Sequence, residues 1–572
     1  MLVKPPSARP HHVVFIADPQ LVDPHTYPGR PWPLSSLTVA FTDKYLKRSY
    51  KTLQRHIDPD TILFLGDLFD GGREWDTIHS GFTASEDQWK GYGQDFWLRE
   101  YDRFGRIFFD PSQVSGGAST QRQKTIHASL PGNHDLGFGT GVQPVVRRRF
   151  HAYFGEGDRV DIIGNHTFVS LDTVSLSAMD NPEAPNELWN TSMAFLDQIQ
   201  NTTQRMLRHE LSHQQATDSL SRYVHATTDD LTTDLHRVVT PPTRQGSDRP
   251  TNLELPTVVL SHVPFYREPG TPCGPLRERH PPSAPNLEND EPNAIRVAGG
   301  YQYQNVLTRD LSRTIAEKVG GVGYVFSGDD HDYCEVVHRA YPSAGGGIRE
   351  ITVKSMSWAM GVRKPGFLLA SLWNPIDERG RPLSNGIQDN GAATLQTHLC
   401  LLPDQLGLFI RYAICLVLTI GVVIVHAVAT TSRDKHALSA KSPVLPTRET
   451  MTDARSRSKG RSRASSTSTH AESNGVLAPR SQNARTRSVS PGSFIGGYGL
   501  PSMQEKRHST LVERAGYYGR ETDDWGGYEV GTKPMGRRRR GTMNQILTRI
   551  RKDLLFVAVP SLVWYYWLMS TG

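Results

Sequence analysis

The chain has 572 residues, 37% of them hydrophobic, and a formal net charge of +6. This length suffices for a domain with a large core and appended segments, whereas the four cysteines lack the paired spacing of zinc sites or small disulfide scaffolds. The positive charge is concentrated in residues 431–552, which hold about 24 Lys and Arg against about 10 Asp and Glu; they contain no recognisable nucleic-acid module, so we expect no nucleic-acid partner.

Five apolar runs in the first two thirds of the chain end in polar side chains. In chain order they are HVVFIADPQ, ending at Asp18 and Gln20; TILFLGDLFD, at Asp67 and Asp70; TIHASLPGNHD, at Asn133, His134 and Asp135; TVVLSHVPF, at His262; and GYVFSGDDHD, at Asp329 and His331. Apolar runs of this kind predict buried strands of a sheet covered on both faces, here by helices such as residues 37–56. Because ligands collect beyond the carboxyl ends of such strands, we expect one polar site built from all five segments.

The last of these runs carries an unusual density of charge. Asp329, Asp330, His331 and Asp332 follow directly on an apolar segment. Side chains packed this closely repel one another or stay protonated unless a cation lies among them. The pattern therefore predicts a bound metal ion.

The ordered motifs resemble those of the calcineurin-like metallophosphoesterases. The matching residues are Asp18-Pro19-Gln20, Gly66-Asp67-Leu68-Phe69-Asp70, Gly132-Asn133-His134-Asp135, His262 and Gly328-Asp329-Asp330-His331. The resemblance covers about residues 12–375 and implies an α/β fold with four layers (αββα), in which two β-sheets pack together between helices. We place this domain at residues 12–400, after an N-terminal stub of residues 1–11.

The resemblance also implies a reaction centre with two divalent metal ions. By position, the ligands of the first metal would be Asp18, Gln20, Asp67 and His331, and those of the second would be Asp67, Asn133, His262 and Asp329. His134 would protonate the leaving oxygen or stabilise the phosphoryl group, and Asp135 would orient His134, with Asp70 and Asp330 behind the ligands. Two such ions supply a nucleophile at neutral pH and offset the charge of a phosphodiester in hydrolysis.

Two residues depart from the family pattern, because Gln20 and Asp329 stand where histidine is usual. Oxygen donors favour harder ions over zinc, so we predict Mn²⁺, with Mg²⁺, Fe and Zn²⁺ as alternatives. Whether the neutral Gln20 binds metal stays open at this point. Asp330 and Asp332 are alternatives to Asp329 as the ligand.

Two later apolar stretches predict a membrane protein. Residues 406–429 are long enough to cross a bilayer, and residues 554–569 predict a second, shorter span with Pro560 inside it. Between them, residues 430–552 predict a disordered basic loop, which the flanking positive charges place in the cytosol. The catalytic domain would then be lumenal, where sequons at Asn165, Asn190 and Asn201 could be glycosylated. No apolar signal precedes it, so either a further segment lies upstream, which we expect, or the domain is cytosolic.

The segments ADPQLVD, GDLFDGGRE and FSGDDHDYC, with the anchor, resemble the fungal endoplasmic-reticulum branch of the family, which is related to the yeast cell-division-control phosphoesterase and to the GPI-anchor ethanolamine-phosphate phosphodiesterase. This implies removal of ethanolamine phosphate from the glycan of glycosylphosphatidylinositol (GPI) anchors. The substrates would be GPI-anchored proteins or GPI lipid in the endoplasmic reticulum or Golgi membrane. The alternatives are a broad phosphomonoesterase or protein phosphatase, and a non-catalytic scaffold, which Gln20 and Asp329 favour and His134 argues against. A disulfide among Cys273, Cys334 and Cys400 is left open.

Overall fold

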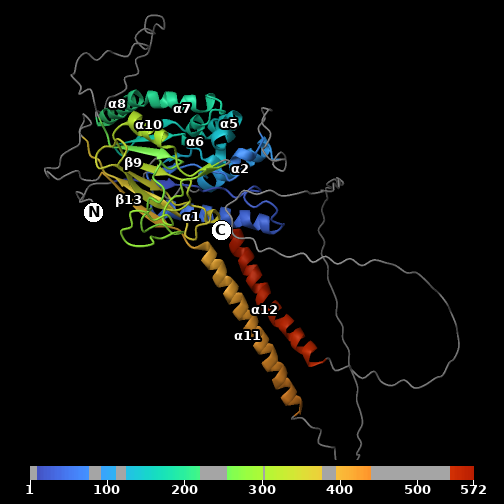
Figure 1. Cartoon of the computed structure of the whole chain (residues 1–572). Coiled ribbons are helices and arrows are strands. Elements are labelled where there is room, and N and C mark those ends of the chain that lie inside the picture. The colour runs from blue at the N-terminus through green and yellow to red at the C-terminus, as the bar shows by residue number, and fades with distance from the viewer. Residues whose placement is uncertain are drawn as a thin grey trace, which may run out of the picture. The chain divides into compact units, whose positions relative to one another are not determined.

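The structure is a computed structural model, and it describes residues 10–76, 92–110, 124–218, 254–300, 303–376, 394–439 and 541–571. The chain divides into two units, residues 1–424 with 553–572, and residues 425–552. The first unit contains every β-strand of the described residues (Figure 1). The described part of the second unit consists of the adjoining turns of two long helices, where Arg549 pairs with Asp434 at 2.6 Å.

One sheet has five strands. In spatial order they are β13 (Leu395–Leu401), β12 (Gly366–Leu372), β1 (His11–Ile16), β2 (Thr61–Phe64) and β3 (Thr125–His127). β1, β2 and β3 run parallel, with Val13 opposite Thr61 and Thr61 opposite Thr125, whereas β12 and β13 are antiparallel additions. The carboxyl ends of the three parallel strands therefore meet at one edge of this sheet.

The other large sheet has six strands. In spatial order they are β10 (Cys334–His338), β11 (Ile348–Thr352), β9 (Val322–Ser327), β6 (Thr257–Ser261), β5 (His166–Leu171) and β4 (Arg159–Ile163). β11, β9, β6 and β5 are parallel, and the two edge strands are antiparallel. A separate hairpin joins β7 (Gly299–Gly300) to β8 (Tyr303–Gln304).

The two large sheets pack face to face through the alternation of side chains along their strands. On β1, Val13 and Phe15 point to the core between the sheets, whereas Val14 and Ile16 belong to the core beneath the helices. Phe15 stacks on Phe326 of β9 with ring centroids 4.2 Å apart. Because both faces of the sheets are buried, the predicted continuous apolar runs appear here as strands.

Helices cover the outer faces of both sheets. They are α1 (Leu34–His56), α2 (Gln94–Phe108), α4 (Asn133–Leu136), α5 (Pro144–Phe154), α6 (Thr173–Ser177), α7 (Glu187–Asp197), α8 (Ile199–Asp218) and α10 (Arg309–Val319). Phe104 of α2 packs against Phe64 of β2, and Tyr50 of α1 packs against Phe108 of α2. Helices α7, α8 and α10 form the layer on the other side (Figure 1). The architecture is the mixed α/β fold in four layers that the sequence predicts.

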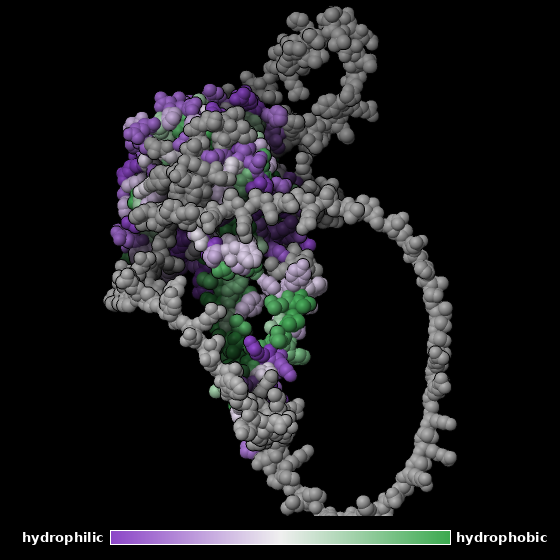
Figure 2. Space-filling model, turned by 90° about the vertical axis from the view of Figure 1, so that its right-hand side faces the viewer, coloured by the Kyte–Doolittle hydropathy of each residue, from purple (hydrophilic) through white to green (hydrophobic). Residues whose placement is uncertain are grey.

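Two long helices follow the domain: α11 (Gln405–Ser439) and α12 (Thr542–Thr571). Among the described residues, α11 alone is long and apolar enough to cross a membrane, over Gln405–Asp434. Its apolar side chains are exposed, Val417 and Val422 each by 68%, and Figure 2 shows hydrophobic surface on the long helices. The predicted second span, residues 554–569, lies within α12. Both helices extend into the ends of the segment predicted to be disordered, whose residues 440–540 lie outside the described ones.

A disulfide that the sequence left undecided joins Cys273 to Cys334, both fully buried. Cys400 and Cys415 are free thiols. Cys334 begins β10, three residues after His331, and Cys273 lies in the long connection between β6 and β7. The bond therefore ties that connection to the segment that carries the last cluster of acidic residues.

Replacing both bonded cysteines with serine is expected to lower the free energy of unfolding by about 2–4 kcal/mol, because the bond closes a loop between residues 61 positions apart. Thermal unfolding of the detergent-solubilised full chain measures this. The matched control, Cys400→Ser with Cys415→Ser, should unfold as the wild type does. Equal loss of stability in both double variants would contradict the structural role of the bond.

Candidate metal centre

The predicted ligands follow the carboxyl ends of strands from both sheets. Asp18 comes two residues after β1 and Asp67 three after β2, Asn133 begins the short helix α4 after β3, and His262 follows β6 directly. Asp329 and His331 follow β9. Since these strand ends converge between the two sheets, residues far apart in the sequence form one site.

Most of these residues hold a backbone conformation that side chains other than glycine rarely adopt. The φ angle lies between 26° and 70° at five of them: Asp18, Gln20, Asp67, Asp329 and His331. Each such residue costs about 1–3 kcal/mol and persists only where the surrounding contacts impose it. Strain of this kind collects at functional sites, and here it marks three of the strand ends.

Asp18, Asp67 and His262 form the centre of the site. Their ligand atoms lie within 4.8 Å of one another, and all three side chains are buried. The Nε2 atom of His262 lies 3.5 Å from Asp67 Oδ1, while its Nδ1 atom donates a hydrogen bond to the Leu65 carbonyl oxygen at 2.7 Å. This bond fixes the tautomer in which Nε2 keeps its lone pair, the form of imidazole that binds a metal.

Asn133 and Asp329 extend the centre on the Nε2 side of His262. Asn133 Oδ1 lies 3.1 Å from this nitrogen and Asp329 Oδ1 lies 3.7 Å from it. The backbone N–H of Asp329 donates to Asp18 Oδ1 at 3.1 Å, which links the ends of β9 and β1. The four donors predicted for the second metal thus lie together.

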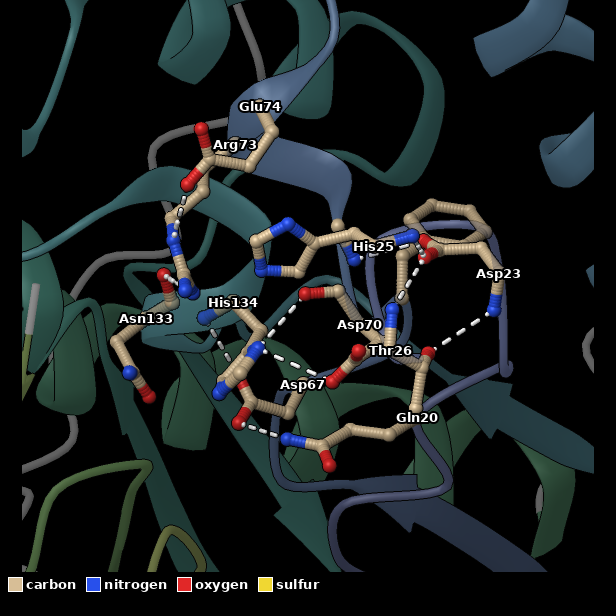
Figure 3. A network of polar contacts seen from close by, with 12 residues as sticks. Gln20, Asp23, His25, Thr26, Asp67, Asp70, Arg73, Glu74, Asn133 and His134 are labelled. Atoms are coloured by element: carbon tan, nitrogen blue, oxygen red, sulfur yellow. Dashed lines mark hydrogen bonds and ion pairs between the residues drawn. The ribbon is translucent and has the colours of Figure 1, made fainter. Parts of the chain in front are cut away.

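Gln20 has a role that its residue type alone did not reveal. Its Nε2 donates to Asp67 Oδ2 at 2.7 Å and so holds the carboxylate predicted to bridge the metals (Figure 3). Gln20 Oε1 and Asp18 Oδ2 are buried and have no hydrogen-bond partner in the described structure. Because a buried acceptor costs about 1–3 kcal/mol when unsatisfied, these two oxygens fit a cation bound beside Asp67.

The electrostatics of the carboxylates point the same way. Burial, and then the charge of Asp67, raise the pKa of both Asp18 and Asp329 well above its ordinary value. Burial also raises the pKa of Asp67, but the neighbouring His262 and His134 outweigh it and leave that pKa below its usual value. All three carboxylates can be ionised together at neutral pH only if a positive charge lies among them. Bound divalent cations supply such a charge.

His331 lies at the edge of this centre. Burial, and next the charge of Arg279, lower the pKa of its imidazole to about 3. The charges of Asp67 and His134 also act on that pKa, which places His331 in the same electrostatic environment. At neutral pH its imidazole is therefore uncharged and able to bind a metal.

The acidic neighbours of Asp329 have partners of their own. Asp330 pairs with Arg277, with Oδ2 2.6 Å from Nη1. Asp332 pairs with Lys354 at 2.7 Å and accepts the backbone N–H of Arg279 at 2.8 Å. These contacts leave Asp329 as the carboxylate that faces the metal ligands. No sequence pattern indicated the partners Arg277 and Lys354, because they come from connections without a regular pattern.

His134 is the second residue of the helix α4 and lies beside Asp67, and its backbone N–H donates to Asp67 Oδ1 at 2.8 Å. Its Nδ1 donates to the Asp70 carbonyl oxygen at 2.7 Å and lies 3.2 Å from Asp70 Oδ1 (Figure 3). Burial and the charge of Arg73 lower the pKa of His134, but Asp67 and Asp70 outweigh them and raise it to about 9. The imidazole is therefore held in its protonated form, which suits a general acid.

Asp135 differs from its predicted role. Its carboxylate accepts the backbone N–H groups of Leu68, Phe69 and Gly132 at 2.9–3.1 Å. It therefore ties the loop after β2 to the loop after β3, while Asp70 occupies the position against the imidazole. The sequence placed Asp135 next to His134 along the chain, but a helical turn directs the two side chains apart.

A further carboxylate that the sequence analysis missed supports the first ligand segment. Asp23 accepts the backbone N–H of Gly71 at 2.8 Å and those of His25 and Thr26 at 2.7 and 3.2 Å (Figure 3). Burial, and then the charge of Asp70, raise the pKa of Asp23 to about 8. Asp23 thus fastens the segment after Gln20 to the loop that carries Asp67 and Asp70.

Paired sheets whose strand ends supply carboxylate, amide and imidazole ligands define a metal-dependent hydrolase. A sequence profile of the calcineurin-like phosphoesterases matches residues 11–333, more than half of the chain, and the chain belongs to this family. It therefore contains a phosphoesterase domain, and enzymes of this family use a dinuclear metal centre.

Relatives agree with this assignment. Cell division control protein 1 of Saccharomyces cerevisiae is 34% identical over 403 residues, which are 70% of this chain and 62% of the relative. Metallophosphoesterase 1 homolog of Drosophila melanogaster is 25% identical over 64% of this chain and 72% of its own length. Protein TED1 of Saccharomyces cerevisiae is 21% identical over 60% of this chain and 71% of its own length. The chain thus spans less than two thirds of the length of the first of these relatives.

Gly132→Ala is expected to reduce the metal content of the purified protein by about tenfold or more, because the added Cβ would lie 2.0 Å from Asp67 Oδ1 and displace that carboxylate. Elemental analysis after dialysis against Mn²⁺ measures this. Gly105→Ala is the matched control, since a Cβ at that position in α2 meets nothing within 4 Å. Full metal content in the Gly132 variant would mean that Asp67 does not bind the ion.

Asp70→Asn is expected to lower kcat by about tenfold or more and leave the metal content unchanged, since it weakens the support of His134. Asp70 raises the pKa of His134, so this pKa falls in the variant and the alkaline limb of the pH profile of kcat/KM moves to lower pH. Asp135→Asn should instead destabilise the fold and leave that limb in place. The reverse pattern would restore Asp135 as the orienting residue.

Proposed function

We propose that this chain is a membrane-anchored, metal-dependent phosphodiester hydrolase that removes ethanolamine phosphate from the glycan of GPI anchors. The observation that carries the hydrolase part is the buried set of Asp18, Asp67 and His262. Among the described residues, Asp18 Oδ2 in this set and the nearby Gln20 Oε1 lack a hydrogen-bond partner. Such a set is costly to bury without metal ions. This buried set supports phosphoester hydrolysis, the chemistry of the family, at the strand ends.

The metal ions and the side chains around them have distinct roles in the proposed hydrolysis. The two ions supply an activated nucleophile and offset charge on the phosphoryl oxygens when bound. His134 is held through Nδ1 by Asp70, which leaves Nε2 to give its proton to the leaving oxygen. Arg73, which donates to the Asn133 carbonyl oxygen at 3.0 Å, keeps a positive charge beside His134, where it favours a phosphate.

The donor set favours manganese. Two positions that are histidine in the family pattern are Gln20 and Asp329 here, so oxygen atoms replace nitrogen atoms. Gln20 Oε1 lacks a hydrogen-bond partner in the described structure and is placed to be one of these donors. Hard oxygen ligands suit Mn²⁺ or Mg²⁺ better than Zn²⁺.

The membrane part rests on α11, and the positive charges that follow its apolar stretch, Arg433 among them, favour the cytosolic side for that end. The domain then faces the lumen of the endoplasmic reticulum. The sequon residues Asn190 and Asn201 of that domain are exposed, which suits glycosylation in the lumen. The buried disulfide suits an oxidising compartment. The GPI substrate rests on the resemblance of the motif segments to the fungal endoplasmic-reticulum branch.

The metal-stripped full chain in detergent is expected to release ethanolamine phosphate from isolated GPI glycans only after Mn²⁺ is added. Asp67→Asn should lower this rate by about a hundredfold or more, because it removes charge shared by both metal sites. Mass spectrometry of the released ethanolamine phosphate and of the remaining glycan measures the reaction. Asp197→Asn, on the surface of α7, is the control and should keep the wild-type rate.

The soluble diester bis(p-nitrophenyl) phosphate separates the two parts of the proposal. Manganese-dependent cleavage of this compound without any release from the glycans would keep the hydrolase and discard the GPI substrate. Cleavage of neither compound with Mn²⁺, Mg²⁺ or Zn²⁺ supplied would leave a non-catalytic scaffold as the better description.

A further inference from the structure

The start of α1 carries apolar side chains that the domain does not cover. Trp32, just before the helix, is 81% exposed, and Leu34 and Leu37 in its first turn are 55% and 43% exposed. Elsewhere on α1, Leu46 and Tyr50 are buried in the core. Single exposed apolar residues are common on proteins, but three at one end of one helix call for an apolar neighbour.

The same face of α1 meets the first turn of the apolar helix α11. Leu34, Leu37 and Phe41 follow the spacing i, i+3, i+7 and so lie on one face. The Phe41 ring lies 5.9 Å from that of Phe409 in α11 and 6.3 Å from that of Tyr565 in α12. One turn further on, the Tyr45 hydroxyl donates to the Pro403 carbonyl oxygen at 2.8 Å.

A second set of contacts links this region to the metal centre. Trp358 packs against Phe409 with centroids 6.0 Å apart, and the neighbouring Met360 carbonyl accepts from Arg279, whose charge acts on His331. From the other side, the Tyr27 hydroxyl donates to the Ala359 carbonyl at 3.4 Å. Both the first and the last ligand segments of the metal centre therefore lie within a few contacts of the start of α11.

Positive charge accompanies this apolar surface. The Arg30 guanidinium lies 3.7 Å over the Tyr27 ring and donates to Thr38 at 2.7 Å. Arg363 donates to Asp404, whose carboxylate also accepts the N–H of Gly407 in the first turn of α11. Exposed arginines beside exposed Trp and Leu are the composition of segments that lie in the headgroup layer of a bilayer.

We propose that Trp32, Leu34 and Leu37 insert into the boundary between headgroups and acyl chains of the bilayer that α11 crosses. The metal centre then receives a phosphodiester that is still attached to a membrane-embedded lipid. This inference rests on the proposed function for the anchor and the reaction. It adds that the catalytic domain binds the membrane itself, in a fixed orientation, through α1.

Quenching of Trp fluorescence tests the insertion without any need for activity. The full chain is reconstituted in phosphatidylcholine vesicles with brominated acyl chains, and the quenched fraction of the emission is compared with that in unbrominated vesicles. Trp32→Phe should reduce the quenched fraction, because the quenched Trp32 emission is removed, whereas Trp189→Phe, on α7 against the other sheet, should not. Equal quenched fractions in the wild type and Trp32→Phe would overturn the proposal.

The second test compares one scissile bond in two settings: intact GPI lipid in vesicles and the delipidated GPI glycan in solution. In Leu34→Ser with Leu37→Ser, the ratio of the embedded to the soluble rate is expected to fall by about tenfold. Leu287→Ser with Val337→Ser, which are 46% and 43% exposed elsewhere on the domain, is the matched control and should keep the ratio.

The outcomes separate this inference from the proposed function. An unchanged ratio with normal hydrolysis of both substrates overturns membrane docking and keeps the enzyme. Hydrolysis of neither substrate by the wild type rejects the GPI substrate, and the quenching result then decides docking by itself. If Leu34→Ser with Leu37→Ser instead abolishes a concentration-dependent dimer in detergent, the face binds a second copy of the chain and the proposal fails.

Discussion

The repulsion among buried carboxylates at the strand ends is the constraint on which this structure depends. Asp18, Asp67 and Asp329 come from β1, β2 and β9, and burial together with their mutual charge makes the ionised state of Asp18 and Asp329 unfavourable in the protein alone. A fold optimised only for stability would not retain such a cluster, because neutral side chains of similar volume would pack there without that cost. The two layers of sheet supply the rigidity that holds the carboxylates close, and bound cations supply the charge that makes this closeness favourable.

The carboxylates near the site fall into two groups that hydrogen bonding distinguishes. Asp23 and Asp135 accept several backbone N–H groups each and so fasten one ligand loop to another. Asp18, by contrast, keeps a buried oxygen without a hydrogen-bond partner in the described structure. A carboxylate that accepts several backbone N–H groups supports the backbone, whereas a buried oxygen without such a partner fits a cation. Asp67 stands between the two groups, because its oxygens accept from Gln20 and His134 while it lies among the predicted ligands. Asp330 and Asp332, each paired with a cation, belong to the supporting group.

Sequence patterns predicted the features that depend on local order. The strands at β1, β2, β6 and β9 appear as continuous apolar runs because both faces of each sheet are buried, and the ligand motifs follow them by fixed short spacings. The resemblance to the family implied that Asp135 orients His134, but in the structure Asp70 lies against the imidazole, because side-chain direction depends on the helical turn. The pairing of Cys273 with Cys334, and the position of Arg279 near His331, depend on a long connection without periodicity. No local pattern encodes contacts of that kind.

The two departures from the family pattern act together through charge. Gln20, where the family pattern has histidine, is also a neutral side chain. Its amide donates to Asp67 through Nε2 and offers the adjacent Oε1 as an acceptor, and the two nitrogens of an imidazole ring cannot take the same two positions. Replacing histidine by Asp329 adds a negative charge, so the donor set carries three carboxylates where the family pattern has two. A more negative set of oxygen donors binds a divalent cation more strongly and reduces the electron-withdrawing power of that cation toward bound groups. If Gln20 and Asp329 bind the ions as proposed, the site would hold them more tightly and activate the nucleophile less. His134, with the pKa of its imidazole raised to about 9, would then matter more for protonation of the leaving oxygen.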